Sequence, residues 1–437
     1  MKKRIPFCLL LWLGAVPMAS ALDLIQTYEL ALQNDPTLRQ ALADYESAKE
    51  TRPQAKAQLL PNLSVNGDAN RVYQDTDKSP TGRTGSDSFN SSGISIDLFQ
   101  PVYRRDRLYQ LQQTDDLIAS AEAQYLAAEQ DLMFRTAQAY FGILDAQENL
   151  KFAEANKKAI ARQLDQAKQR FDVGLIAITD VHEAQAAYDG ARSTEIAAKN
   201  DVDSAWEALL QIIGPRPVED IATLKPEFPL TPPEPADLDQ WSETALKQNL
   251  SVLAAYHNAE LARKGIEVQR SGHYPTLDLV ASYGLDDTTG DSASRFETGV
   301  IGLQLAVPLY QGGGVSSRVR QAQYDFQSAQ DSLDAQRRSV DRVVKDAYRG
   351  VETSISQVEA LAATVVSSQS ALEATEAGYE VGTRTIIDVL NVQRNKFDAD
   401  RNYAVARYAY ILNGLLLKGA ASILSREDLE QVNAWLQ

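Results

Sequence analysis

The sequence contains little cysteine, little histidine and, outside one short region, little proline. Its single cysteine is Cys8, and its three histidines, His182, His257 and His273, are far apart. We find no metal-ligand spacing, no glycine loop followed by lysine, and no Ser-His-Asp arrangement. These absences argue against an enzyme, and we expect neither a cofactor nor a bound metal.

Long hydrophobic runs are also scarce. One run, Ile5–Met18, follows three basic residues and precedes Ala19-Ser20-Ala21, so residues 1–21 are expected to be a secretory signal peptide. An uncleaved anchor is the alternative, although the run is shorter than the about 20 residues of a spanning helix. Because no later stretch resembles a membrane helix, the exported chain would meet a membrane through strands or its surface. It would also lack Cys8, and therefore any disulfide.

Acidic residues outnumber basic ones. The sequence has 43 lysines and arginines against 59 aspartates and glutamates, a formal charge of −16. Removal of the three basic residues at positions 2–4 leaves 40 against 59, a charge of −19. Nucleic acid is therefore not expected as a partner, since its binding depends on clustered positive charge.

Two stretches about half the chain apart are versions of one another. Residues 170–185 read RFDVGLIAITDVHEAQ and residues 378–393 read GYEVGTRTIIDVLNVQ, with six of sixteen positions identical at an offset of 208. Because this unit is far longer than a solenoid repeat, we infer an internal duplication into two equivalent halves. The halves are expected at residues 22–213 and 241–437. A connector at 214–240 contains seven prolines, so it should cross the outside of the helical body without regular helix.

Each half is predicted to contain a helix too long for a compact domain. Residues 105–172 and 315–380 lack proline. Apolar or alanine side chains recur every seven residues, which indicates a supercoiled seam where helices pack closely. They are Leu111, Ile118, Tyr125, Leu132, Ala139, Ala146, Ala153, Ile160 and Ala167, then Val319, Phe326, Leu333, Val340, Ala347 and Leu361, with an interruption at Ser354. At about 1.5 Å per residue, the first helix should reach roughly 100 Å.

Glycines mark where each long helix turns back. Gly174 and Gly382 supply the left-handed conformation that a helix exit favours. Thr179 and Thr385 lie near the start of the return helices, with Asp180 as an alternative cap. The remaining helices are expected at residues 179–213, 385–418, 24–56 and 238–270, with a short amphipathic one within 425–437.

A pair of strands is predicted before each long helix. The strands are residues 62–73, 93–103, 276–283 and 300–310, with a polar loop at 286–297. Their alternation of apolar and polar residues is typical of membrane barrel strands, and also of any half-buried strand. Four strands leave two unpaired edges, so closure requires several chains. Two copies would give eight strands and a filled lumen, whereas three would give twelve and room for a channel.

Four segments resemble the TolC family of outer-membrane efflux proteins, and the resemblance covers essentially the whole mature chain. They are RQLDQAKQRFDVGLIAITDV (162–181), YPTLDL (274–279), PLYQGG (308–313) and EAGYEVGTRTIIDVL (376–390). The resemblance implies a mostly α fold with a β-barrel part. In it, a trimeric, coiled-coil-like helical barrel in the periplasm continues into a 12-stranded outer-membrane barrel with four strands per chain.

The resemblance also implies a function. The protein would be a channel-tunnel that conducts small molecules or unfolded proteins to the exterior, gated by untwisting of its periplasmic helix tips. The implied partners are two further copies, a periplasmic adaptor protein, an inner-membrane pump or ABC transporter, and outer-membrane lipid. From the residues alone, a secreted helical pore-former or coiled-coil adhesin is the alternative, although it would not need two repeated strand pairs.

In the family, bonds between an outer and an inner helix pair hold the tips closed. Carried over by motif, the gate residues are Gln163, Gln169, Thr179 and Asp180 on the outer pair, and Glu376, Tyr379 and Arg384 on the inner pair. Tyr379 and Arg384 would face Thr179 and Asp180, and Glu376 would face Gln163. Charge-assisted bonds contribute about 1.5–3 kcal/mol and neutral ones about 0.5–1.5 kcal/mol, so three such sets could close a gate that a docking protein still opens. From spacing alone, Arg384 and Asp180 are ordinary exposed charges near a turn.

Asp388 matches the acidic residue at the family's tunnel mouth. Threefold symmetry would place three carboxylates around one constriction, where they attract cations. One helical turn later, the family's second acidic position is Asn391 in this sequence. We therefore expect one acidic ring instead of two, and weaker block by multivalent cations.

The two tip turns resemble the surface on which periplasmic adaptors dock. They are Val173-Gly174-Leu175 and Val381-Gly382-Thr383. The turn itself requires glycine whether or not anything binds, so loss of activity on substitution would support docking only if assembly is retained.

Overall fold

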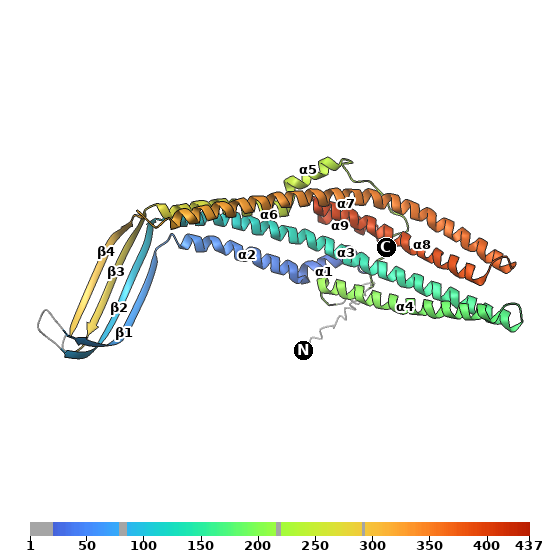
Figure 1. Ribbon diagram of the computed structural model, residues 1–437, viewed down its shortest axis with the longest axis horizontal. Helices are drawn as coiled ribbons and strands as arrows, with labels where there is room; N and C mark the ends of the chain where they lie inside the picture. The colour runs from blue at the N-terminus through green and yellow to red at the C-terminus, as the bar shows by residue number, and fades with distance from the viewer. Residues whose placement is uncertain (1–20, 78–84, 216–219, 291–292) are drawn as a thin grey trace, which may run out of the picture. The chain divides into compact units, whose positions relative to one another are not determined.

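The computed structural model describes residues 21–77, 85–215, 220–290 and 293–437. The predicted signal peptide lies almost wholly outside these ranges. The helices are α1 (Leu24–Asn34), α2 (Pro36–Ala57), α3 (Arg105–Asp172), α4 (Ile178–Ile213), α5 (Leu238–Gln248), α6 (Leu250–Arg270), α7 (Gly314–Glu380), α8 (Ile386–Ala420) and α9 (Arg426–Asn433). The strands are β1 (Asn62–Thr76), β2 (Gly85–Tyr103), β3 (Thr276–Thr288) and β4 (Ser294–Ala306), and Figure 1 labels all these elements.

The described residues form two compact units. One contains the residues up to Pro36 together with Glu129–Trp241 and Val344–Gln437, and here we name it the tip unit. The other contains Thr37–Ala128 and Ser242–Val343, and we name it the sheet unit. Each unit therefore takes segments from both predicted halves of the chain.

The sheet unit holds an antiparallel sheet of order β1-β2-β3-β4. Its register places apolar side chains on one face, where Val65 pairs with Ile96 and Ile96 pairs with Tyr283. Further members of this face are Leu63, Leu98, Ala281, Ile301, Leu303 and Leu305. The opposite face carries Ser64, Asn66, Asp97, Ser282 and Gln304. Much of the apolar face, including Leu63, Val65, Ile301 and Leu303, is exposed in the single chain.

Both long helices form where the sequence predicts them. α3 coincides with the proline-free run at 105–172, and α7 begins one residue before its predicted start. Every predicted seam residue is buried or half-buried, which confirms the seven-residue pattern. Ser354, which interrupts that pattern, is also buried, and its hydroxyl accepts a 2.7 Å hydrogen bond from the Asn413 side chain on α8. The polar group is thus satisfied within the packed seam.

Two predicted helices are each broken into two. Asp35 lies between α1 and α2 with extended backbone, because the residue before Pro36 is disfavoured in the helical region. Pro36 then starts α2, at the position where a missing N–H costs no hydrogen bond. Asn249 separates α5 from α6, and its side chain accepts hydrogen bonds from the backbone N–H groups of Ser251 and Val252. The predictions of single helices at 24–56 and 238–270 are therefore wrong.

The strands of the second pair differ from the predicted ones at both ends. Both extend farther into the loop between them, and β4 ends earlier than predicted. β3 and β4 continue through much of the expected polar loop at 286–297, with Asp286 paired to Phe296 and Thr288 to Ser294. Backbone pairing thus extends beyond the apolar pattern. β4 ends at Ala306 instead of Tyr310, just before Pro308, which cannot donate to a strand ladder.

The core of the tip unit surrounds the middle of α3. Tyr140, Phe141 and Leu144 are almost fully buried there. The Tyr140 hydroxyl donates a 2.7 Å hydrogen bond to the carbonyl of Ala222 in the connector. Ile221, Ala222 and Leu224 are buried, so part of the connector belongs to the core, and the prediction that it crosses the outside of the helical body is wrong for this part.

Candidate gate at the helix tips

The turns that end α3 and α7 have the same geometry. Gly174 and Gly382 adopt φ values of +76° and +79°, as the sequence predicts for a helix exit. The N–H of Leu175 donates to the carbonyl of Arg170 at 2.9 Å, and the N–H of Thr383 to that of Gly378 at 2.8 Å. Each bond joins residues five positions apart and satisfies a carbonyl at the helix end, as the 6→1 bond of a Schellman motif does.

The predicted docking residues lie at the surface of these turns. The exposed fractions are 70% for Val173, 74% for Leu175 and 76% for Val381. Thr383 is also exposed, and its hydroxyl donates to the carbonyl of Gly378 at 3.0 Å. Each chain thus presents three large apolar side chains on two well-defined turns.

The return helices start differently. Thr385 caps α8, because its side chain accepts from the N–H of Asp388 while the Asp388 carboxylate accepts from the N–H of Thr385 at 2.9 Å. α4 instead begins after Ala177, which has no side-chain cap. Asp180 lies in the first turn of α4, so the suggestion that it caps this helix is wrong. Thr179 is exposed within the same turn.

Near the tip turns, two contacts between described residues join the α3–α4 hairpin to the α7–α8 hairpin. The side-chain amide of Gln163 donates to the amide oxygen of Gln393 at 2.7 Å. The Arg170 guanidinium lies over the Tyr379 ring, 4.5 Å from its centroid, in a cation–π contact. Both contacts border a groove of about 790 Å³ between the hairpins. Its lining includes four predicted gate residues, Gln163, Gln169, Glu376 and Tyr379.

The structure brings only part of the predicted gate set together. Within the described residues, no hydrogen bond or ion pair joins Tyr379 or Arg384 to Thr179 or Asp180. Arg384 is exposed, and its side chain lies against the backbone of Gly378. The predicted pairings therefore stay predictions.

Sequence reasoning missed Gln393 and Arg170. Gln393 is only 3% exposed, on the same buried face of α8 as Ile386 and Val389. A glutamine at an apolar position of a helix stripe was the available signal, since a buried amide needs a partner. The aromatic partner of Arg170 could not be found from sequence, because the two residues are far apart in the chain.

The predicted mouth residues lie in the first turns of α8. Hydrogen bonds from Thr385, first from its backbone N–H and then from its hydroxyl, lower the pKa of the Asp388 carboxyl. The carboxylate is therefore ionised at neutral pH. Asn391 accepts a 3.2 Å hydrogen bond from Arg394.

The histidines lie in separate environments. In the described part of the chain, no group of three or more His, Cys, Asp or Glu side chains is placed to bind a metal ion. His257 lies 3.2 Å from Asp116 in the sheet unit. Among the helices within the described ranges, none combines the length and apolar character that a bilayer-crossing helix requires.

An amphipathic sheet with open edges, together with paired helical hairpins that end in exposed apolar turns, is the arrangement expected of an outer-membrane export channel. The chain belongs to the outer membrane efflux protein family, whose model matches residues 27–215 and 241–420. It is 38% identical to the outer membrane protein TolC of Escherichia coli, over 99% of this chain and 89% of that protein. It is 29% identical to the alkaline protease secretion protein AprF of Pseudomonas aeruginosa, over 95% and 88% of the two chains. The crystal structure of the Campylobacter jejuni CmeC outer membrane channel shares its fold, with a TM-score of 0.81 and 17% identity over 94% of this chain and 89% of that one.

Proposed function

We propose that three copies of this chain join their sheets into one twelve-stranded barrel in the outer membrane. The amphipathic sheet carries this proposal. Its apolar face is exposed in the single chain, and β1 and β4 are each paired on one side only. Lipid would cover the apolar face, and a neighbouring copy would pair each open edge.

The helical hairpins form the periplasmic exit duct of an export complex, and their tips form its gate. The predicted gate and docking residues support this role, because most of them either line the groove between the hairpins or lie on the two tip turns. Thr179, Asp180 and Arg384 are proposed to act in the assembled trimer. Asp388 forms the single acidic ring at the mouth, and Asn391 lies one turn above it.

A periplasmic adaptor is the proposed partner at the tip turns, and an inner-membrane pump or ABC transporter supplies the energy. The names of the family and of one relative support two kinds of transport, efflux and protein secretion. We also propose that residues 22–213 and 241–437 are the duplicated halves, joined by the connector at 214–240. The two stretches that match the family model lie on either side of residues 216–240 and support this division. Transport is the proposed role, without catalysis.

The direct test is the assembly state of the purified protein. Native mass spectrometry in detergent should give a trimer, and outer-membrane fractions should contain a heat-modifiable band. A deletion strain should become sensitive to drugs, or lose a secreted protein, or both. A stable monomer in detergent-free buffer would contradict the proposal.

A further inference from the structure

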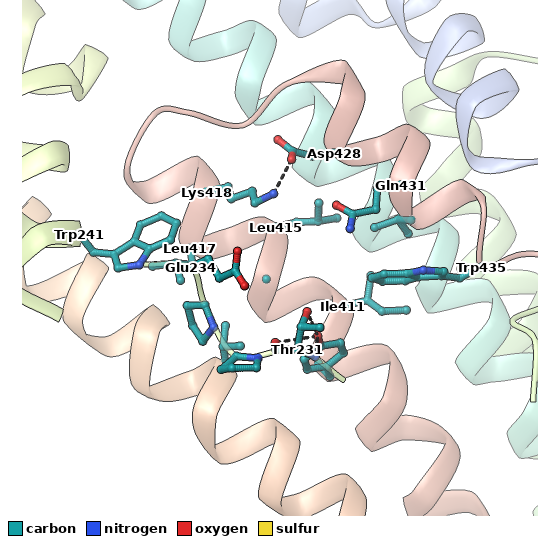
Figure 2. Close-up of a pocket in the computed structure, with 16 residues that line it drawn as sticks. Thr231, Glu234, Trp241, Ile411, Leu415, Leu417, Lys418, Asp428, Gln431 and Trp435 are labelled. Carbon is teal, nitrogen blue, oxygen red and sulfur yellow. Dashed lines mark hydrogen bonds and ion pairs between the residues drawn. The ribbon is translucent and has the colours of Figure 1, made fainter. Parts of the chain in front are cut away.

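A second cavity lies in the tip unit, away from the groove between the hairpins. It has a volume of about 370 Å³, within the range of about 300–1,000 Å³ of ligand pockets. Its lining comes from the connector between Thr231 and Glu234, from Trp241 on α5 and Val351 on α7, from the last turns of α8, and from α9 with Trp435 just beyond it. Figure 2 shows the side chains that line it.

Aromatic side chains form two of its walls, and hydrogen bonds hold them in place. Trp241 is 4% exposed, and its indole N–H donates to the carbonyl of Pro235 at 2.8 Å. The Tyr410 hydroxyl accepts from the N–H of Thr231 at 2.9 Å. Trp435 packs on Phe228 with ring centroids 5.4 Å apart. The cavity is thus built before any ligand arrives, which limits the entropy cost of binding.

Two of the three charged side chains that line the cavity are paired with each other, and the third is not. Lys418 and Asp428 form an ion pair at 2.5 Å, and Asp428 also accepts from the N–H of Ser425 at 2.9 Å. Glu234 is exposed at the rim of the cavity, and it is the one charged lining residue for which the described residues provide no hydrogen bond or ion pair. Figure 2 draws Glu234 next to Trp241, with Trp435 on the opposite side of the cavity.

We propose that this cavity binds a small amphipathic ammonium ion. The apolar body of the ligand lies between the two indoles, and its ammonium group pairs with the Glu234 carboxylate. Aromatic faces attract cations, and the lining carries one unbalanced negative charge. An anion would find Lys418 already paired. A metal ion would find one free carboxylate among aromatic walls, and hard cations need several oxygen ligands. The site is independent of the channel function proposed above.

The test uses phenethylammonium chloride as the probe and 2-phenylethanol as its neutral isostere. Two of the three tryptophans in the described residues line the cavity, so intrinsic fluorescence of the purified full-length protein reports binding. We expect saturable binding of the ammonium ion and at least tenfold weaker binding of the alcohol. Bound ammonium should also raise the melting temperature, since a ligand that binds only the folded state stabilises it.

Glu234→Gln should weaken ammonium binding about tenfold and leave the alcohol unaffected. Glu227→Gln is the matched control, because Glu227 is an exposed acid on the same connector that does not line the cavity. Trp435→Ala should weaken the binding of both molecules. Equal affinity for the alcohol, an unchanged affinity in Glu234→Gln, or no saturable binding at millimolar probe would each overturn the proposal.

Discussion

The side-chain amide of Gln163 on α3 donates its 2.7 Å hydrogen bond to Gln393 on α8, and this contact leaves two polar atoms unpaired. The oxygen of Gln163 and the nitrogen of Gln393 are buried without a partner in the described residues. Flipping both amides would still leave one donor and one acceptor unpaired. A neutral hydrogen bond contributes about 0.5–1.5 kcal/mol, and an unsatisfied buried group costs about 1–3 kcal/mol. The contact therefore joins the two hairpins with little net stabilisation, which suits a gate that a partner must open.

Replacing both amides with leucine should strengthen closure. The double variant Gln163→Leu/Gln393→Leu removes the two unsatisfied groups and adds apolar contact, so single-channel conductance in planar bilayers should fall. Gln393→Ala alone should raise conductance, because it removes the bond and the packing together. The control is Gln185→Leu, at the equivalent position of the other repeat, where the side chain bonds Asp189 within its own helix. Higher conductance in the double leucine variant than in the wild type would contradict this interpretation.

Asp388→Asn should reduce cation selectivity, since it removes the charge from the proposed tunnel mouth and retains a side-chain oxygen that can accept from the N–H of Thr385. The measurement is the reversal potential in a salt gradient. Thr385→Val is the control for loss of the helix cap. It removes the capping hydroxyl that bonds Asp388 but leaves the Asp388 carboxylate and its charge. Unchanged selectivity in Asp388→Asn would remove this residue from the mouth.

Asn391→Asp should add a second acidic ring to the mouth of the proposed trimer and strengthen block by multivalent cations. A trivalent cation applied from the tip side of the bilayer should block the variant at a concentration about tenfold lower than the wild type, which corresponds to about 1.4 kcal/mol. Arg394 stands one turn from this position and should moderate the effect, since it already bonds Asn391. An equal blocking concentration in both proteins would show that Asn391 does not face the ion path.

Selectivity should be constant between pH 8 and pH 5. Hydrogen bonds from Thr385 lower the pKa of Asp388 below its ordinary value of about 3.9. A carboxyl with a lowered pKa in the folded state stabilises that state above the unfolded pKa, and this contribution is lost as pH falls through the folded value. The negative charge of Asp388, and the hydrogen bonds that its carboxylate accepts from Thr385, should therefore be lost only below about pH 4. A decline of selectivity between pH 6 and pH 5 would show instead that the three carboxylates repel one another strongly enough to raise the pKa.

Val381→Asp should abolish export and leave the proposed trimer intact, because it places a charge on an exposed apolar turn without changing the turn glycine. Gly382→Ala should destabilise the tip by about 1 kcal/mol or more, since its φ of +79° disfavours any side chain. Native mass spectrometry and an efflux assay distinguish the two outcomes. Normal export in Val381→Asp would exclude this side chain from adaptor docking.

Ile301→Lys should prevent membrane assembly, whereas Gln304→Lys should be tolerated. Ile301 lies on the apolar face of β4 and Gln304 on the polar face, three residues away. A lysine on the lipid side of a barrel costs about 2–4 kcal/mol near the bilayer midplane, and on the polar side it remains hydrated. The heat-modifiable trimer in outer-membrane fractions is the measurement, and equal yields from both variants would refute the assignment of the faces.

Local patterns predicted most of the secondary structure. α3 agrees with its prediction at both ends, because a proline-free run with a seven-residue apolar repeat has no competing local conformation. The two helix breaks were missed for different reasons. Pro36 is a local sequence signal for the first break, whereas Asn249 acts by accepting backbone hydrogen bonds, and many asparagines within helices do not.

The sequence by itself determined the long helices, the tip turns and the two faces of the sheet, because each depends on residues close together in the chain. Only the tertiary structure decided which side chains meet across the hairpins, such as Gln163 with Gln393, and which carboxylate remains unpaired in the cavity that Trp241 and Trp435 line. These contacts join residues from distant segments, and their partners depend on the relative rotation and translation of packed helices. A repeat pattern fixes which face of a helix is buried, but it does not fix which residue of the opposite helix that face will meet.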